Sequence, residues 1–147
     1  MTWLAALLMA SASSEPPADL DRVLSARHMT ETCETLEHTY EIAQLAEAAN
    51  SMSQPPWAPM RAAHCVGEAA ERGGASHIRA WLDDASVPGL AAAAVAGLEQ
   101  SPGPAGLEAA IAQRLHDPRF AAATRLERSR HPTLAQLVDR RQEKNSD

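Results

Sequence analysis

One short helical phrase occurs three times in the second half of the chain. The copies begin at Ile78, Ile111 and Leu134, and each has apolar residues on one helical face and an aspartate near its end. Three alanine-rich stretches alternate with these copies and align with one another at an offset of 30 residues. They are residues 60–67, 90–97 and 120–127. Such self-similarity predicts stacked helix pairs, each too small to bury its own apolar face.

The composition also favours helices over strands. Alanine makes up about one residue in five, and phenylalanine and tyrosine occur once each. Alanine is the best helix former, whereas β-branched and aromatic residues favour strands. We therefore expect an all-α chain with one helical domain over residues 18–141 and a frayed polar tail at 142–147. About eight helices are expected, at roughly 18–29, 31–49, 57–71, 76–84, 87–100 and 105–116, with two more beginning near 117 and 131.

The repeated phrase has the spacing of a known helical repeat. Residues 82–84 lead to Gly97, and residues 115–117 lead to Leu126, with leucine, aspartate and small residues in matching places. The second half of an earlier copy is present at Ala62, Cys65, Val66 and Gly67. In these positions the chain resembles the short HEAT-like repeats, the type also found in bilin lyases. The resemblance implies a short α-solenoid of antiparallel helix pairs with a concave binding surface, although the closing glycine is lost at Glu127.

Two classes of function follow from this resemblance. The favoured class is a non-enzymatic module that binds or scaffolds other proteins, and the alternative is a small lyase-like accessory enzyme. The chain has no glycine-rich phosphate loop and no Gly-x-Ser-x-Gly motif, so we expect no catalytic residues and no cofactor. An enzyme should show several polar side chains converging in one pocket, whereas a scaffold should show a continuous exposed face. The sequence does not predict the oligomeric state.

The histidines and cysteines do not have the spacing of a metal site. His64 lies beside Cys65, but neighbours on a helix point about 100° apart and rarely bind one ion. His28, Cys33 and His38 are five residues apart, which does not place them on one helical face either. We therefore expect no metal ligands, and surface or helix-end positions for the histidines.

Other polar and aromatic residues have structural explanations. Asp83 and Asp84, like Asp117, occur where the repeat places a turn, so we expect an aspartate there to cap the next helix. Trp57 and Trp81 occupy apolar helical positions, and we expect both to lie in the core.

The N-terminus has features of a cleaved leader. Residues 1–12 form an apolar run that ends in Ala10-Ser11-Ala12, the small-x-small pattern of a signal-peptidase site, and 13–17 read as a linker. We therefore expect export to the periplasm or secretion. The alternative is a cytoplasmic protein with a short apolar helix at its start. The run is too short to span a bilayer, so stable membrane insertion is not expected.

Cys33 and Cys65 are the two cysteines of the chain and fall on different predicted helices. In an exported protein they would form a disulfide that joins the two helices, worth about 3 kcal/mol in the chain-entropy model. The alternative is a pair of buried free thiols that act as small apolar residues. The sequence leaves both possibilities open.

The partner surface is expected on the alanine-rich helices. In the resemblance these helices line the concave face, with the stretch at 90–97 as a smooth floor. Polar groups on either side would come from Arg61, His64, Glu68, Arg119, Arg125 and Arg128. Arginines beside an apolar surface suit a protein or peptide partner, and an acidic one in particular. The net charge of −6, with 14 acidic and 5 basic residues before residue 113, argues against nucleic acid.

Overall fold

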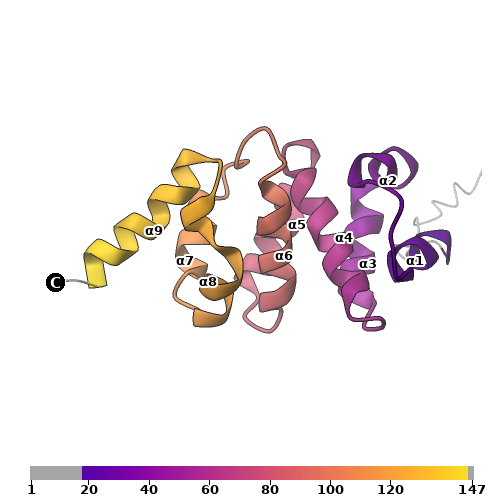
Figure 1. Cartoon of the computed structure of the whole chain (residues 1–147), viewed down its shortest axis with the longest axis horizontal. Coiled ribbons are helices and arrows are strands. Elements are labelled where there is room, and N and C mark those ends of the chain that lie inside the picture. The colour runs from indigo at the N-terminus through magenta and orange to yellow at the C-terminus, as the bar shows by residue number, and fades with distance from the viewer. Residues whose placement is uncertain (1–17, 146–147) are drawn as a thin grey trace, which may run out of the picture.

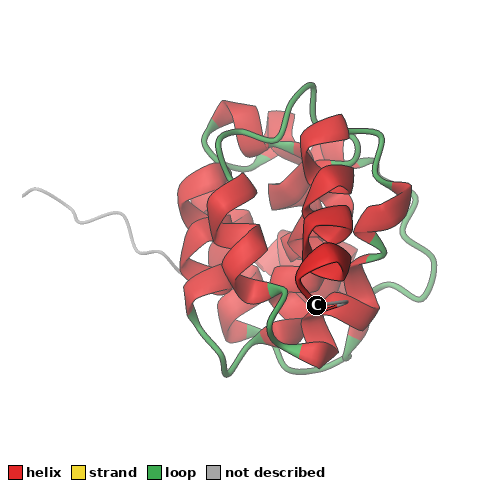
Figure 2. Ribbon diagram, turned by 90° about the vertical axis from the view of Figure 1, so that its left-hand side faces the viewer, coloured by secondary structure: helices red, strands yellow, loops and turns green. Residues whose placement is uncertain are grey.

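The chain is helical throughout the part that the structure, a computed structural model, describes, residues 18–145 (Figures 1 and 2). This part has nine α-helices, two short 3₁₀ helices and no strand, which confirms the all-α prediction. The α-helices are α1 (Ala18–Ser25), α2 (Cys33–Thr39), α3 (Ile42–Ser51), α4 (Trp57–Glu68), α5 (Ala75–Asp83), α6 (Pro88–Leu98), α7 (Glu108–Arg114), α8 (Pro118–Thr124) and α9 (Pro132–Asn145). The 3₁₀ helices are η1 (Ala70–Arg72) and η2 (Leu126–Arg128). The leader and linker expected at 1–17 lie outside the described residues.

The helices follow one another along the long axis of the molecule, from α1 and α2 at one end to α9 at the other (Figure 1). α4 packs against α6 and α6 against α8, while α5 packs against α7 and α7 against α9. The alanine-rich stretches therefore belong to one row of contacting helices and the repeated phrase to another. Within the described residues, no helix has both the length and the apolar character needed to cross a membrane.

The helix expected over residues 31–49 is in fact two helices, α2 and α3. Tyr40 and Glu41 separate them, and both have extended backbone conformation. The Glu41 N–H donates a hydrogen bond to Oε1 of Gln44 at 2.9 Å, which satisfies a backbone donor at the start of α3. The apolar periodicity runs through this break, so the expectation of one long helix was wrong. Local capping outweighed the periodic pattern.

The first and last helices also differ from those expected. α1 ends at Ser25 rather than near Met29, because the chain bends at residues 26–28 toward α2. α9 continues to Asn145, through residues that were expected to fray from 142 onward. Glutamine, glutamate and lysine at 142–144 are good helix formers, and no glycine or proline ends the helix earlier.

α4 and α6 make their closest approach at Gly67 and Gly97. A β-carbon at Gly67 would lie 2.0 Å from the carbonyl oxygen of Ala94, and one at Gly97 would lie 1.9 Å from that of His64. Side chains do not fit at such distances, so each helix places a glycine against the backbone of the other. These two glycines close the aligned alanine-rich stretches. The position aligned with them is Glu127, which is exposed in η2. The third alanine-rich stretch therefore has no glycine for such a close contact with a neighbouring helix.

The segment before α9 is fixed to the end of α6 by polar groups. The Glu99 carboxylate accepts hydrogen bonds from the Ser129 hydroxyl at 2.5 Å and the Arg130 N–H at 2.8 Å. Nε2 of the buried His131 lies 2.8 Å from the carbonyl oxygen of Leu98. These bonds hold the start of α9 although α6 and α9 are far apart in the sequence.

Candidate functional site

A groove runs over α4, with α2 on one side and α6 on the other. Two depressions form it, one of about 350 Å³ beside the start of α4 and one of about 500 Å³ beside its end. Cys33 lines both depressions, so they meet at the disulfide. We refer to the two together as the α4 groove, to the first as its apolar end and to the second as its acidic end.

The apolar end exposes large hydrophobic side chains. Trp57 is 41% exposed and Met60 is 37% exposed, and they are the exposed large hydrophobic residues of the described part of the chain. Met29 and Ala93 line the same depression from the segment before α2 and from α6. Tryptophan and methionine are enriched at binding surfaces, where burial against a partner removes apolar area from water. This end of the groove therefore has the character of a docking site.

The exposure of Trp57 corrects the expectation that both helical tryptophans lie in the core. Trp81 is buried as expected, and its Nε1 donates a hydrogen bond to Oδ1 of Asn50 at 2.7 Å. Trp57 begins α4 on its outer face, where its Nε1 donates to the carbonyl oxygen of Ser25 at 3.3 Å. α1 packs against α4 beside this turn, yet the indole remains half open to solvent.

Arg61 lines the apolar end of the groove and is bound to the end of α1. Its guanidinium donates hydrogen bonds to the carbonyl oxygens of Leu24 at 2.9 Å, Arg27 at 3.1 Å and Ala26. Carbonyls at a helix C-terminus lack intrahelical partners, and a cation there also interacts favourably with the helix dipole. The guanidinium carbon also lies 5.9 Å from the centroid of the Trp57 ring, a cation–π distance. Arg61 thus fixes α1 and Trp57 in place.

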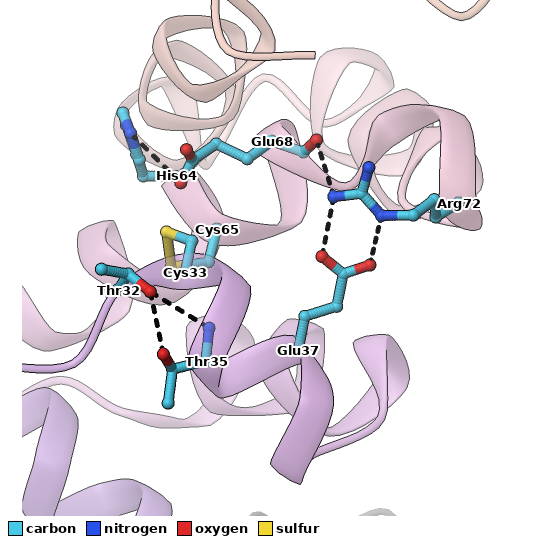
Figure 3. Close-up of a disulfide and its surroundings, with 8 residues drawn as sticks. All are labelled: Thr32, Cys33, Thr35, Glu37, His64, Cys65, Glu68 and Arg72. Carbon is cyan, nitrogen blue, oxygen red and sulfur yellow. Dashed lines mark hydrogen bonds and ion pairs between the residues drawn. A yellow bond between two sulfur atoms is a disulfide. The ribbon is translucent and has the colours of Figure 1, made fainter. Parts of the chain in front are cut away.

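The acidic end of the groove contains an ion pair between η1 and α2. Arg72 Nη2 donates to Glu37 Oε2 at 2.7 Å, and Arg72 Nε donates to the other carboxylate oxygen (Figure 3). These hydrogen bonds hold the pKa of Glu37 below its ordinary value and raise the pKa of Arg72. Glu34 and Glu68 line the same depression without an arginine bound to either side chain. The surplus charge at this end is therefore negative.

The Cys33–Cys65 disulfide lies where the two ends of the groove meet (Figure 3). It joins the first residue of α2 to the third turn of α4, and it confirms the pairing expected for an exported protein. Oγ1 of Thr32, the N-cap of α2, accepts a hydrogen bond from the Thr35 N–H at 3.1 Å. Disulfides are typical of oxidising compartments, so this bond fits a protein outside the reducing cytoplasm.

The remaining expected binding residues are only partly brought together. His64 lines the apolar end and Glu68 the acidic end, and their side chains are 3.9 Å apart. On α8 the Arg119 side chain instead pairs with Asp117 at 3.3 Å, and the Asp117 carboxylate also accepts from the Arg119 N–H as the expected N-cap. Arg125 and Arg128 are exposed on the segment after α8 and line neither end of the α4 groove. The other expected cap is absent, because Asp84 accepts bonds from Ser86 within its own turn.

A separate depression, of about 430 Å³, lies away from the α4 groove, between α7 and α9. Leu115 and Leu137 form its apolar part. Arg140, Arg141 and Lys144 line it from α9 and give it positive charge. This arrangement has the chemistry expected for an acidic partner, but on helices other than the alanine-rich ones.

Ala93 belongs to the stretch at 90–97 that was expected as the floor of the partner surface, and it lines the apolar end. Sequence reasoning did not single out Met60 or Arg72 as groove residues. Nothing in the spacing pointed to Arg72, whose partner Glu37 lies on another helix. Comparison of the chain with protein-family models, curated proteins and solved structures found no match.

Proposed function

We propose that the protein is a non-enzymatic interaction module that binds a short segment of a partner protein in the α4 groove. One observation carries the proposal: Trp57 and Met60, the exposed large hydrophobic residues of the described part, line the same end of one groove. Binding energy at protein interfaces is concentrated in a few such anchors within a pocket. The disulfide and the leader-like residues 1–12 support a place of action in the periplasm or outside the cell.

The module is proposed to be a short HEAT-like α-solenoid. Support comes from the two rows of contacting helices, α4–α6–α8 and α5–α7–α9, which alternate along the chain. Gly67 and Gly97 occupy equivalent places in α4 and α6, as stacked repeats require. The α4 groove then occupies the first part of the surface formed by the alanine-rich row.

The two ends of the groove define the partner segment. An apolar side chain suits the end with Trp57 and Met60, and a lysine or arginine suits the end with Glu34 and Glu68. Trp57 and Glu68 lie at opposite ends of α4, about 16 Å apart at 1.5 Å per helical residue. An extended peptide rises about 3.3 Å per residue, so its apolar and basic side chains should be about five residues apart. The whole surface is shallow and elongated, which suits a peptide.

The acidic end is where polar side chains converge, so it is also where the lyase-like alternative would have its active site. A general acid or base works best with a pKa near the pH of the reaction. Arg72 moves the pKa of Glu37 in the opposite direction, below its ordinary value. The ion pair favours a structural and binding role for these groups over proton transfer.

The test uses two glutamate substitutions on the same helix. Random peptides displayed on phage would be selected on the oxidised protein, and the affinity of enriched peptides measured by calorimetry. Peptides with an apolar residue and a basic residue about five positions apart are expected. Ala93→Glu places a charge in the apolar end and should weaken binding at least about tenfold, or 1.4 kcal/mol.

Ala96→Glu is the matched control, because Ala96 is exposed on α6 and lines neither end of the groove. It should leave the affinity unchanged. Equal affinity of the two variants, with their helicity intact, would place the peptide elsewhere and contradict the proposal.

The depression between α7 and α9 is a second candidate surface, for an acidic segment. Its apolar floor and the cations Arg140, Arg141 and Lys144 favour a peptide with leucine-like and acidic side chains. Acidic peptides from the same selection should lose binding in the Arg140→Glu, Arg141→Glu double variant. If Arg125→Glu with Arg128→Glu abolishes their binding instead, the acidic partner binds beside α8, as the sequence pattern predicts.

A further inference from the structure

The disulfide has a third potential metal ligand beside it. One carboxylate oxygen of Glu68 and the two sulfur atoms of Cys33 and Cys65 all lie within 4.8 Å of one another. Glu68 follows Cys65 by three residues on the same face of α4, and the Glu68 side chain reaches back along the helix toward His64 and the sulfurs (Figure 3). Cys65 is buried, and Cys33 and Glu68 are half-buried. The group is therefore a partly enclosed cluster and not a set of freely solvated acids.

We infer that the reduced protein binds a zinc ion through Cys33, Cys65 and Glu68. A dithiol reductant adds two electrons and two protons to the sulfur–sulfur bond, which gives two thiols and leaves the reductant as its own disulfide. Zinc binding then releases the two thiol protons and forms two zinc–thiolate bonds. The Glu68 carboxylate supplies the third ligand and a water molecule the fourth.

The ligand set suits zinc better than other divalent ions. Thiolates select zinc over magnesium and calcium, which prefer oxygen ligands alone. Zinc is commonly four-coordinate, with zinc–sulfur bonds near 2.3 Å and zinc–carboxylate bonds near 2.1 Å. Two thiolates on one zinc are farther apart than bonded sulfurs, so both cysteine side chains must rotate on reduction. One Glu68 oxygen already lies within 4.8 Å of both sulfurs. The carboxylate can therefore still reach the zinc ion after the cysteine side chains rotate.

The site would hold α2 on α4 under both redox conditions. The disulfide joins the helices in an oxidising compartment, and zinc would join the same two residues before the disulfide forms. A structural zinc site contributes its binding free energy to folding. The walls of the α4 groove would thus stay together in either state, whatever the groove binds.

Cobalt replaces zinc as the probe in the experiment. The full chain is reduced with a dithiol, separated from the reductant without oxygen and titrated with Co²⁺. We expect thiolate-to-cobalt charge-transfer bands in the near ultraviolet, visible bands of tetrahedral geometry, and displacement of cobalt by Zn²⁺, which binds more tightly. The oxidised protein should show none of these bands. Reduced protein without them would overturn the inference.

Two glutamine variants test the third ligand. Glu68→Gln should lower cobalt affinity at least about tenfold, since even an outer-shell partner can contribute that much. Glu34→Gln removes a charge from the same depression outside the cluster and should leave the affinity unchanged. Equal affinity of Glu68→Gln and the unmodified protein would exclude Glu68 as a ligand. If reduction alone lowers the helical circular-dichroism signal, zinc should restore it, and failure to do so would also overturn the inference.

Discussion

The N-terminal and C-terminal regions of this protein are held together by different means. α2 buries one apolar residue, Leu36, and relies on cross-links to α4 and η1: the Cys33–Cys65 disulfide and the Glu37–Arg72 ion pair. α1 is likewise held by the guanidinium of Arg61.

The C-terminal region uses apolar burial and hydrogen bonds. Phe120 of α8, Leu126 of η2 and Leu134 of α9 are buried. Hydrogen bonds accepted by the Glu99 carboxylate, and one between His131 and the Leu98 carbonyl, then fix the segment that leads into α9. α8 has seven residues, as α2 has, and also buries one side chain, so helix length does not separate the two regions. The difference lies in the bonds: covalent and ionic cross-links hold α2, whereas apolar burial and hydrogen bonds hold the elements around α8.

The two regions also differ in the kind of surface that they offer to a partner. The cross-linked region carries the groove with an apolar and an acidic end, and the C-terminal region carries a basic depression. Positions bound by several cross-links are pre-organised, and a pre-organised groove loses less entropy when it binds a partner. The predictions below test the close contact between α4 and α6 and then the two cross-links of α2, in order of their expected effect on stability.

The largest effect is expected from Gly97→Ala. Its β-carbon would lie 1.9 Å from the backbone oxygen of His64, so α4 and α6 must separate. We expect a loss of more than about 4 kcal/mol in the free energy of unfolding, measured by urea denaturation. Gly89→Ala on the same helix is the control, because its β-carbon would meet only the flexible end of Met60, at 3.1 Å. A Gly97→Ala variant as stable as this control would show that the helices are not in close backbone contact.

Cys65→Ser should have the next largest effect under non-reducing conditions. The disulfide closes a loop with a sequence separation of 32 residues, and its loss is expected to cost about 3 to 4 kcal/mol in the chain-entropy model. Thermal unfolding followed by circular dichroism measures the change. With a dithiol and a metal chelator present, the variant and the unmodified protein should unfold at similar temperatures. Two reactive thiols per chain in the unmodified protein, denatured without reduction, would show that the two cysteines are not bonded to each other.

The smallest effect is expected from loss of the ion pair between Glu37 and Arg72. The pKa of the Glu37 carboxyl is lowered in the folded protein, from an ordinary value of 4.5 that applies to the unfolded chain. The pair therefore stabilises the fold above about pH 4.5, and its contribution is lost as the pH falls through the folded pKa. Because the pair is partly exposed to solvent, we expect less than about 1 kcal/mol.

A double-mutant cycle with Glu37→Gln and Arg72→Gln isolates this contribution. The coupling free energy should be favourable at neutral pH and should shrink under acidic conditions. A coupling that is absent at neutral pH, or that grows on acidification, would contradict the assignment.

Much of the helical organisation could be predicted from the sequence. The alanine-rich stretches form α4, α6 and α8, and the repeated phrase forms α5, α7 and α9, because apolar periodicity reports directly which face of a helix is buried. Gly73 ends η1 with a positive φ of 111°, a backbone conformation that favours glycine. The pairing of the cysteines was one of two possibilities that the sequence left open, and the structure contains it.

The candidate site depended on contacts that the sequence does not encode locally. Trp57 and Trp81 have similar helical settings, yet only the tertiary structure decides that a neighbour covers one and leaves the other 41% exposed. Arg61 was expected beside a partner surface, and only the tertiary structure shows that its guanidinium also donates hydrogen bonds to the end of α1. The sequence determined the helices and their buried faces, because those depend on local propensity and spacing. The tertiary structure decided which outer faces stayed open and which charges were already paired, because both depend on segments distant in the chain.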